Sequence, residues 1–529
     1  MQFVDRKRRK YPFSSREGKR PDIFVFTVDM IPPEFYQSNP VLCYLNLPTW
    51  QSLQKQATNF TNAFSVSPLC SGSRAALFTG RYPYILVNEE RSHDGTRTQL
   101  RSEDVVYPEY LKASGYLCGH VGKSHIGTES FLRSFGENCA PWNRWAPPIW
   151  DDSDYHSYLR QLKVELPTWK KVIQGLKPDR KRKGNSYGGW IQQKNGKVFP
   201  VEATYCHYLV NRGLHLLRTM LERRKAGQPV YLQIDLFEPH QPFFIPGGLE
   251  KREEFLRKQL CLPESYEKWV KNGYLWHEPQ PKIYQTYRAN WGLYDRKTAF
   301  DYLVANILQM EVVDCALTRF VEGLKKYGLF QDAVFLLTAD HGEMNLEQGL
   351  IDKGVYGHPK VARVPLLIKL PGQNTAKVVD VPVCLLDVAP TILSLARIKV
   401  ADWLDGENLL PALKGSSWKR KQPFLFESFW HVAPNPAVAI HYYEGKGKHY
   451  RYVYNLCSEI EELYDLNDTH YKNLILEPGL TSLVKEIRNQ LFEFLNDDIR
   501  WRCYRDAFRL DHYADISDES SDTQMFVPE

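Results

Sequence analysis

Two apolar runs constrain this chain most, because each has the composition of a buried strand and leads directly into acidic side chains. Residues 23–28 (Ile-Phe-Val-Phe-Thr-Val) end on Asp29, and residues 333–338 (Ala-Val-Phe-Leu-Leu-Thr) lead into Asp340 and His341. Such runs are typical of strands covered on both faces, as in an α/β sheet. Because the strand ends of these sheets deliver side chains to a site, both acidic ends are candidate ligands for a hard cation.

The segment Cys-Ser-Gly-Ser-Arg at residues 70–74 is the second informative feature, at the mouth of an expected helix. A helix N-terminus has unpaired N–H groups and a partial positive charge, so it favours a bound anion. Arg74 would add a two-pronged contact to sulfate or phosphate oxygens. By itself, the segment is also compatible with a buried thiol in an ordinary loop. A thiolate phosphatase loop is disfavoured, because it needs a longer spacing between Cys and Arg.

Residues 70–80 resemble the signature of the type I sulfatases, Cys-x-Pro-Ser-Arg-x-x-Leu-x-Thr-Gly, within the alkaline phosphatase superfamily. In that family a maturation enzyme oxidises the cysteine to formylglycine, which is the nucleophile. Further elements follow in the family order: Asp29, residues 122–127 (Gly-Lys-Ser-His-Ile-Gly), residues 237–243 (Phe-Glu-Pro-His-Gln-Pro-Phe), residues 340–342 (Asp-His-Gly) and Lys353. The chain departs from the family pattern at Met30, Gly72 and Ser124, where the family has an acidic residue, proline and tryptophan.

The resemblance implies a role for each matching residue. The expected metal ligands are Asp29, Cys70, Asp340 and His341, and the expected catalytic residues are Cys70, Arg74, Lys123, His125, His240 and Lys353. His240 would protonate the leaving group, Lys353 would bind the sulfate, and His125 would assist its later release. Calcium is the expected ion, with magnesium and manganese as alternatives, because carboxylate and imidazole ligands accept all three.

The expected activity is metal-dependent hydrolysis of a sulfate monoester, carried by a small molecule or a carbohydrate. Met30 and His341 favour one alternative, a phosphonate monoester or phosphodiester hydrolase on the same fold. Met30 and Gly72 favour another, an inactive sulfatase-like binding protein. A comparison of hydrolysis rates on sulfates and phosphonates would distinguish the sulfatase from the phosphonate hydrolase. Metal-dependent turnover would exclude the inactive binding protein.

The fold class is α/β, and the resemblance implies a large mixed central sheet flanked by helices with a smaller C-terminal α+β subdomain. Leu303, Ile307, Met310, Val313, Leu317, Val321 and Leu324 recur at spacings of three and four, which predicts a helix packed on the sheet. The expected organisation is a basic tail at 1–20, a catalytic domain at 21–415 with an insertion or lid at 129–202, a sheet-plus-helix subdomain at 416–505, and an acidic tail at 506–529.

Composition narrows the functional class further. The chain has 529 residues, 43% of them hydrophobic, and a net charge of +6, which gives no indication of nucleic-acid binding. Its ten cysteines lack the paired spacing of a disulfide framework or a zinc site. No apolar stretch is suited to a signal peptide or a membrane span, so a cytoplasmic location is expected. The oligomeric state cannot be read from the sequence.

Overall fold

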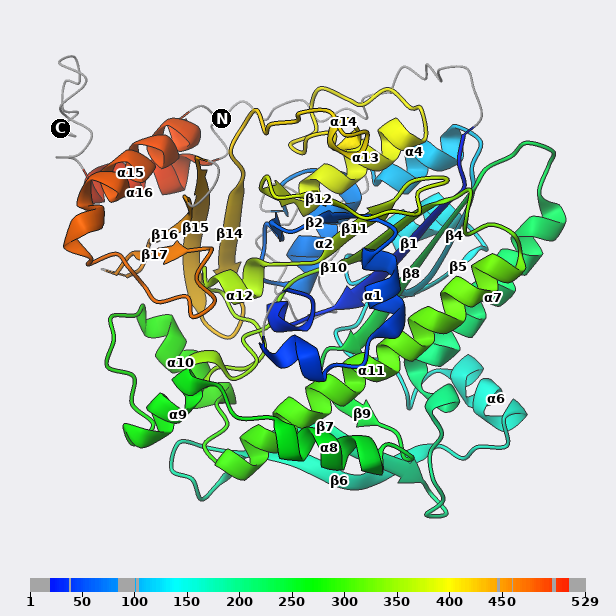
Figure 1. Ribbon diagram of the computed structural model, residues 1–529, viewed down its shortest axis with the longest axis horizontal. Coiled ribbons are helices and arrows are strands. Elements are labelled where there is room, and N and C mark those ends of the chain that lie inside the picture. The colour runs from blue at the N-terminus through cyan, green and yellow to red at the C-terminus, as the bar shows by residue number, and fades with distance from the viewer. Residues whose placement is uncertain are drawn as a thin grey trace.

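The computed structural model describes residues 20–37, 40–83, 100, 104–444, 448–458, 460–496 and 501–512. Within these ranges an eight-stranded sheet in the order β12-β2-β11-β10-β1-β8-β4-β5 forms the centre (Figure 1). Its strands are β1 (Ile23–Asp29), β2 (Thr58–Phe60), β4 (Leu117–Lys123), β5 (Cys139–Trp142), β8 (Val230–Pro239), β10 (Val334–Ala339), β11 (Leu366–Lys369) and β12 (Lys377–Val379). Strands β10, β1, β8, β4 and β5 are parallel, whereas β11 is antiparallel to β10 and β2. The expected mixed sheet is therefore confirmed.

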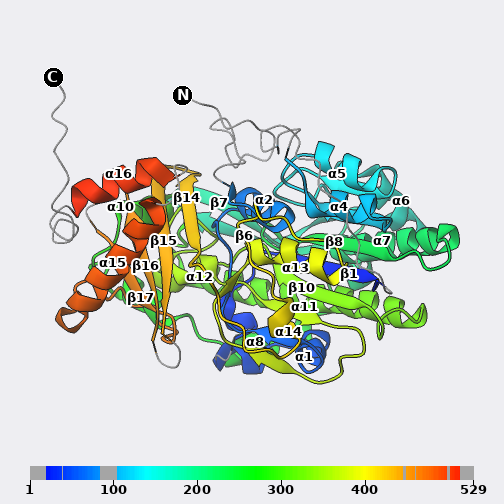
Figure 2. The ribbon, with the colours of Figure 1, turned by 90° about the horizontal axis from the view of Figure 1, so that it is seen from above.

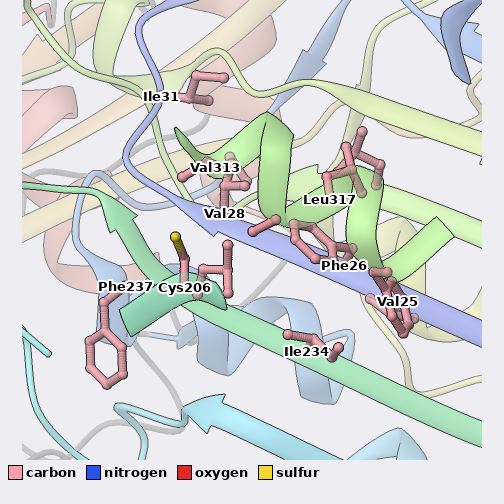
Figure 3. Close-up of a cluster of buried hydrophobic side chains, with 14 of the residues drawn as sticks. Val25, Phe26, Val28, Ile31, Cys206, Ile234, Phe237, Val313 and Leu317 are labelled. Carbon is pink, nitrogen blue, oxygen red and sulfur yellow. The ribbon is translucent and has the colours of Figure 1, made fainter. Parts of the chain in front are cut away.

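Helix α11 (Arg296–Lys326) covers one face of the sheet and confirms the helix predicted from the apolar spacing. Phe24 and Phe26 of β1 point to this face, with ring centroids 6.3 and 5.8 Å from that of Phe320. Figure 3 shows Val313 and Leu317 of α11 beside the apolar side chains of β1. Helix α7 (Tyr205–Arg223) packs against α11 and completes this layer.

The opposite face is covered by α2 (Cys70–Thr79), α4 (Tyr107–Ala113), α5 (Glu129–Phe135) and α13 (Val388–Leu395). Tyr231 of β8 pairs with Ile23, so it points away from α11, and its hydroxyl lies 2.6 Å from that of Tyr107. The Phe78 ring of α2 stacks on Tyr107. Figure 2 shows α2 and α4 across the sheet from α11. This packing fixes α2, and with it Cys70, against the sheet.

Only part of the segment at 129–202, the expected insertion or lid, lies outside the central layers. Strand β5 pairs with β4 and so belongs to the main sheet, while α6 (Ser153–Gln161) follows it. The long hairpin of β6 (Pro167–Leu176) and β7 (Lys183–Gln193) then forms a separate sheet with β9 (Phe243–Ile245). This hairpin lies along one edge of the molecule in Figure 1.

The C-terminal region is an antiparallel sheet of β14 (Leu425–Trp430), β15 (Pro434–Tyr443), β16 (His449–Asn455) and β17 (Glu462–Asp465), with α15 (Thr481–Asn496) and α16 (Arg502–Asp511). It joins the larger region through buried hydrogen bonds: Arg451 Nε donates to the Gly357 carbonyl at 2.7 Å. The boundary expected at 505/506 falls inside α16, because Tyr504 and Phe508 bury one face of that helix. Most of the two expected tails lies outside the described residues.

Shorter elements complete the described chain: α1 (Pro48–Gln54), β3 (Ala63–Phe64), α8 (Glu250–Gln259), α9 (Glu264–Lys271), α10 (Lys282–Trp291), α12 (Pro359–Ala362), β13 (Val383–Cys384) and α14 (Leu410–Leu413). Across the residues that the structure describes, no helix combines the length and apolar character needed to cross a membrane.

Candidate active site

Four neighbouring parallel strands deliver the expected site residues to one edge of the sheet. β10 leads into Asp340, β1 ends at Asp29, β8 ends just before His240, and β4 ends at Lys123. These strands lie side by side in the order β10-β1-β8-β4, so their carboxyl ends meet. Cys70 begins α2 and faces the same edge, as its contacts show below. All five side chains are buried.

The expected metal ligands Asp29, Cys70, Asp340 and His341 form one cluster. Their ligand atoms all lie within 4.8 Å of one another. Cys70 Sγ is 3.1 Å from His341 Nε2 and 3.7 Å from Asp29 Oδ1. His341 Nδ1 is 2.9 Å from the Gly342 carbonyl, so Nδ1–H donates there and Nε2 turns toward the cluster. Side chains far apart in sequence thus converge as the resemblance implied.

The electrostatics of this cluster fit a divalent cation. Burial, together with the negative charges of Asp340 and Cys70, raises the pKa of Asp29 well above its ordinary value. Burial alone would lower the pKa of His341, but Asp340 and Cys70 outweigh it and raise that pKa to about 9. The crowded carboxylates would be relieved by a divalent cation, which two carboxylates, one imidazole and residue 70 could hold.

Arg74 and Lys123 add positive charge beside the carboxylates. Arg74 Nε donates to Asp340 Oδ2 at 2.9 Å, and its Nη1 donates to the Lys123 carbonyl at 2.9 Å. Lys123 Nζ donates to Asp29 Oδ2 and, at 3.1 Å, to the Trp145 carbonyl. Arg74 Nη2 is buried and lies 3.8 Å from Asp29 Oδ2, beyond hydrogen-bond distance, and it has no hydrogen-bond acceptor among the described residues. A buried, unsatisfied guanidinium N–H is the kind of donor that an anionic oxygen would accept from.

His240 and Lys353 form a second buried pair next to the cluster. Lys353 Nζ donates to His240 Nε2 and lies 3.2 Å from Asp352 Oδ1. Burial, followed by the charge of Lys353, lowers the pKa of His240 to about 4. For Lys353, the charges of Asp352, Cys70 and Asp29 outweigh burial and raise the pKa above its ordinary value. Lys353 is thus the cation of the pair, and His240 is neutral.

The structure shows the surroundings of the residues at which the chain departs from the family pattern. Met30 is fully buried with φ of 55°, and its N–H donates to Asp340 Oδ1 at 3.1 Å. An ideal Cβ on Gly72 would lie 2.6 Å from Ser67 Oγ, so the Ser67 hydroxyl occupies the space that a side chain at position 72 would need. His125 is buried directly after β4, with φ of 54°, and its catalytic role stays a prediction.

Sequence reasoning missed the residues that support these groups. Asp235 of β8 lies 3.8 Å from Arg74 Nη1, and His120 Nε2 lies 2.7 Å from its other oxygen. Asp352 accepts a hydrogen bond from Gln241 Nε2 at 2.6 Å while it holds Lys353. A signal for Asp235 was available, because an acidic residue inside an otherwise apolar strand requires a buried partner. No comparable sequence pattern pointed to Asp352, because it neither lies in an apolar strand nor follows one.

Comparison with known proteins agrees with this arrangement. The Sulfatase family model matches residues 43–398, and a model described as N-sulphoglucosamine sulphohydrolase, C-terminal, matches residues 346–497. The uncharacterized sulfatase YidJ of Escherichia coli (strain K12) is 28% identical over 400 residues, which cover 74% of this chain and 71% of that protein. The choline-sulfatase of Rhizobium meliloti (strain 1021) is 25% identical over 471 residues, which cover 84% of this chain and 80% of that protein.

Solved structures share the fold at lower identity. The phosphonate monoester hydrolase SpPMH from Silicibacter pomeroyi superposes with a TM-score of 0.66 at 16% identity, over 91% of this chain and 96% of that one. A sulfatase from Bacteroides thetaiotaomicron VPI-5482, described as putative in its own name, gives a TM-score of 0.63 at 18% identity, over 90% and 93% of the two chains. With a family model that spans Cys70 to Lys353 and the site residues assembled as described, this chain belongs to the sulfatase family and is a sulfatase hydrolase.

Proposed function

We propose that this enzyme hydrolyses a sulfate monoester to an alcohol and inorganic sulfate, with residue 70 as the nucleophile after conversion of Cys70 to formylglycine. The observation that carries the proposal is the position of Cys70 Sγ at the start of α2, inside the cluster of Asp29, Asp340 and His341. The conversion itself requires a maturation enzyme and an oxidant, because a thiol is replaced by an aldehyde. The hydrated aldehyde would supply one hydroxyl for attack on sulfur and a second for the later expulsion of sulfate.

The chain's own residues supply the remaining requirements. A sulfate ester resists attack because anionic oxygens surround the sulfur, so the site must neutralise charge. Arg74 and Lys123 are buried next to residue 70, and the unsatisfied Nη2 of Arg74 is available to a sulfate oxygen. A divalent cation held by Asp29, residue 70, Asp340 and His341 would further polarise the ester oxygens, and we propose calcium, with manganese or magnesium as alternatives.

Proton delivery to the leaving alcohol is assigned to the pair of Lys353 and His240. When the ester bond between sulfur and oxygen breaks, the departing oxygen carries negative charge and needs a proton. Lys353 holds a proton at Nζ, and Nε2 of neutral His240 is its acceptor. An ester oxygen that enters between these two atoms would meet a charged donor. The pair thus refines the expectation that His240 alone is the acid.

The intact mass of the peptide that spans Cys70 tests the nucleophile directly. Protein made in its native host, or together with a maturation enzyme, should show the mass change for replacement of the thiol by an aldehyde. Sulfate release measured on the same preparation should rise with the converted fraction. An unconverted thiol in a fully active preparation would contradict the proposal.

A phosphonate monoester or phosphodiester hydrolase is the second candidate, favoured by Met30 in place of an acidic residue and by His341 in the cluster. The ratio of kcat/KM on an aryl sulfate to that on an aryl phosphonate decides between the two. The third alternative from the sequence, an inactive binding protein, disagrees with the family assignment and with the intact buried cluster. Metal-dependent turnover that is lost in Asp340→Ala is the direct check.

A further inference from the structure

A cavity of about 530 Å³ opens beside His240 and Lys353, and its size lies within the range of small-molecule sites. We propose that it is the leaving-group subsite and that it accepts an uncharged sugar of one or two rings, rather than a polyanionic glycan. This inference rests on the proposed function and deepens it. The cavity walls include Trp145, Asn185, Ser186, Tyr187, Trp291 and His431.

Two tryptophans, Trp145 and Trp291, line the cavity together with His240 and Lys353. Trp145 is 47% exposed, with its ring centroid 5.9 Å from that of His240. Trp291, at the end of α10, packs edge-on against His431 at 5.1 Å. Its backbone carbonyl accepts a hydrogen bond from the Tyr187 hydroxyl at 2.9 Å. Rings held in place in this way offer flat apolar surfaces that match the C–H faces of a pyranose.

The remaining wall supplies neutral hydrogen-bonding groups. Asn185 and Ser186 are exposed side chains of β7 and line the cavity. Asn185 Nδ2 already donates to the Asn290 carbonyl at 3.2 Å, so the Asn185 amide oxygen and the Ser186 hydroxyl are the groups that suit sugar hydroxyls. A purely aromatic leaving group would leave both unused. Aromatic faces combined with neutral polar groups therefore favour a carbohydrate alcohol over a simple phenol.

The charges of the lining disfavour a second anionic group. Among the described residues that line the cavity, Lys353 is the sole lysine or arginine, and it is engaged by Asp352 and His240. A second sulfate or a carboxylate would be desolvated against aromatic walls with no further lysine or arginine of the lining to pair with it. Asp352 is itself neutralised by Lys353, so it offers little to a cationic alcohol. The basic turn at residues 180–183 adjoins β7 but does not line the cavity.

Steady-state kinetics on the full, converted chain test the subsite. We expect Trp145→Ala and Trp291→Ala each to lower kcat/KM for a hexose monosulfate at least about tenfold, while the inhibition constant of inorganic sulfate stays unchanged. Trp150→Ala is the matched control, because Trp150 is 50% exposed in the same segment but lies outside the cavity lining. Trp145→Phe should retain most of the activity. Equal effects of the three alanine variants would overturn the inference.

A comparison of substrates that differ in charge tests the proposal independently. We expect the unmodified enzyme to prefer the hexose monosulfate over both a disulfated uronic-acid disaccharide and choline sulfate. Ser186→Lys should raise kcat/KM for the disulfated sugar relative to the monosulfate. A preference for the disulfated sugar, lost when Lys181 and Lys183 are replaced by alanine, would overturn the proposal and assign the substrate to the basic turn. A preference for choline sulfate would likewise overturn it.

A binding measurement distinguishes failure of the proposed sulfatase reaction from failure of the proposed subsite. If no sulfate ester is turned over, saturation-transfer NMR with the hexose monosulfate still reports on the subsite. Transfer to the sugar ring protons that is lost in Trp145→Ala and kept in Trp150→Ala supports the subsite without the reaction. Absence of transfer in the unmodified protein contradicts it.

Discussion

The Lys353 ammonium donates a hydrogen bond to Nε2 of His240, so this ring nitrogen is the acceptor of the pair. His240 Nδ1 faces the Gln241 carbonyl, which only accepts, so Nδ1 carries the ring proton. A neutral imidazole and a charged lysine therefore stand together in the lining of the cavity that we propose for the leaving group.

Replacement of Lys353 by methionine should release His240 from this arrangement. Loss of the neighbouring positive charge favours the protonated imidazole, so the pKa of His240 should rise from about 4 toward its ordinary value, with burial still opposing the shift. Histidine-selective labelling and NMR titration measure the change, and kcat/KM should fall at least about a hundredfold. Lys251→Met, at an exposed position of α8, is the control. An unchanged His240 titration would show that the contact does not govern its protonation.

Replacement of Cys70 by serine should stop the reaction halfway. A serine hydroxyl can attack sulfur, but it lacks the second hydroxyl that would expel the sulfate, so a sulfated residue 70 should accumulate. Intact-mass measurement after incubation with substrate should show the gain of one SO₃ group on the peptide that contains residue 70. Cys118→Ser, at a buried thiol of β4 outside the cluster, should remain active and unlabelled. Full turnover by Cys70→Ser would rule out the scheme.

Metal binding should stabilise the fold through the carboxylate cluster. A ligand present at a hundred times its Kd adds about 2.7 kcal/mol to the free energy of unfolding. After bound ions have been removed with a chelator, we expect added calcium or manganese to raise the Tm of the unmodified chain. The ion that gives the larger Tm shift at equal concentration is the preferred metal. Asp340→Asn should abolish the shift, whereas Asp332→Asn, in the turn before β10, should keep it. A Tm shift that survives Asp340→Asn would place the metal elsewhere.

The parts of the site that follow strands could be predicted from sequence, whereas those set by packing could not. Asp29 and Asp340 end apolar runs, and parallel pairing of β1 with β10 brings them together. The lack of space for a side chain at Gly72, next to Ser67, depends on how α2 sits on its preceding loop, which no periodicity records. Asn185 and Trp291 meet at one cavity only because the β6–β7 hairpin lies against α10. Strand β5 lies within residues 129–202 but pairs with β4, and its four residues are too few for the sequence pattern to indicate a strand of the central sheet.

The lack of space for a side chain at position 72 predicts that Gly72 and Ser67 are energetically coupled. An alanine at position 72 places Cβ 2.6 Å from Ser67 Oγ, so Gly72→Ala should destabilise the fold by about 1 to 3 kcal/mol despite the better helix propensity of alanine. Ser67→Gly should cancel most of this cost in the double variant. Denaturant unfolding of the four proteins gives the coupling energy. Additive single-variant effects would show that Ser67 simply rotates away.

Glu238 should make stability fall as pH rises. This β8 carboxyl is fully buried, and desolvation raises its pKa from the ordinary 4.5 to about 7, although the Cys206 N–H donates to it at 3.1 Å. Between these two pH values the folded chain holds a proton that the unfolded chain has released. The stabilisation is therefore complete below about pH 4.5 and is lost by about pH 7, with up to about 3 kcal/mol at stake.

Glu238→Gln carries no such proton, so its free energy of unfolding should lack this part of the pH dependence. The difference between the unmodified chain and Glu238→Gln, measured by denaturant unfolding at pH 5 and pH 8, isolates the contribution from other titrating groups. Glu322→Gln, an exposed position of α11, should follow the unmodified chain. If the free energy of unfolding changed equally with pH in the unmodified chain and in Glu238→Gln, the Glu238 carboxyl would be ionised in the folded chain at both pH values. A partner other than the Cys206 N–H would then stabilise its charge.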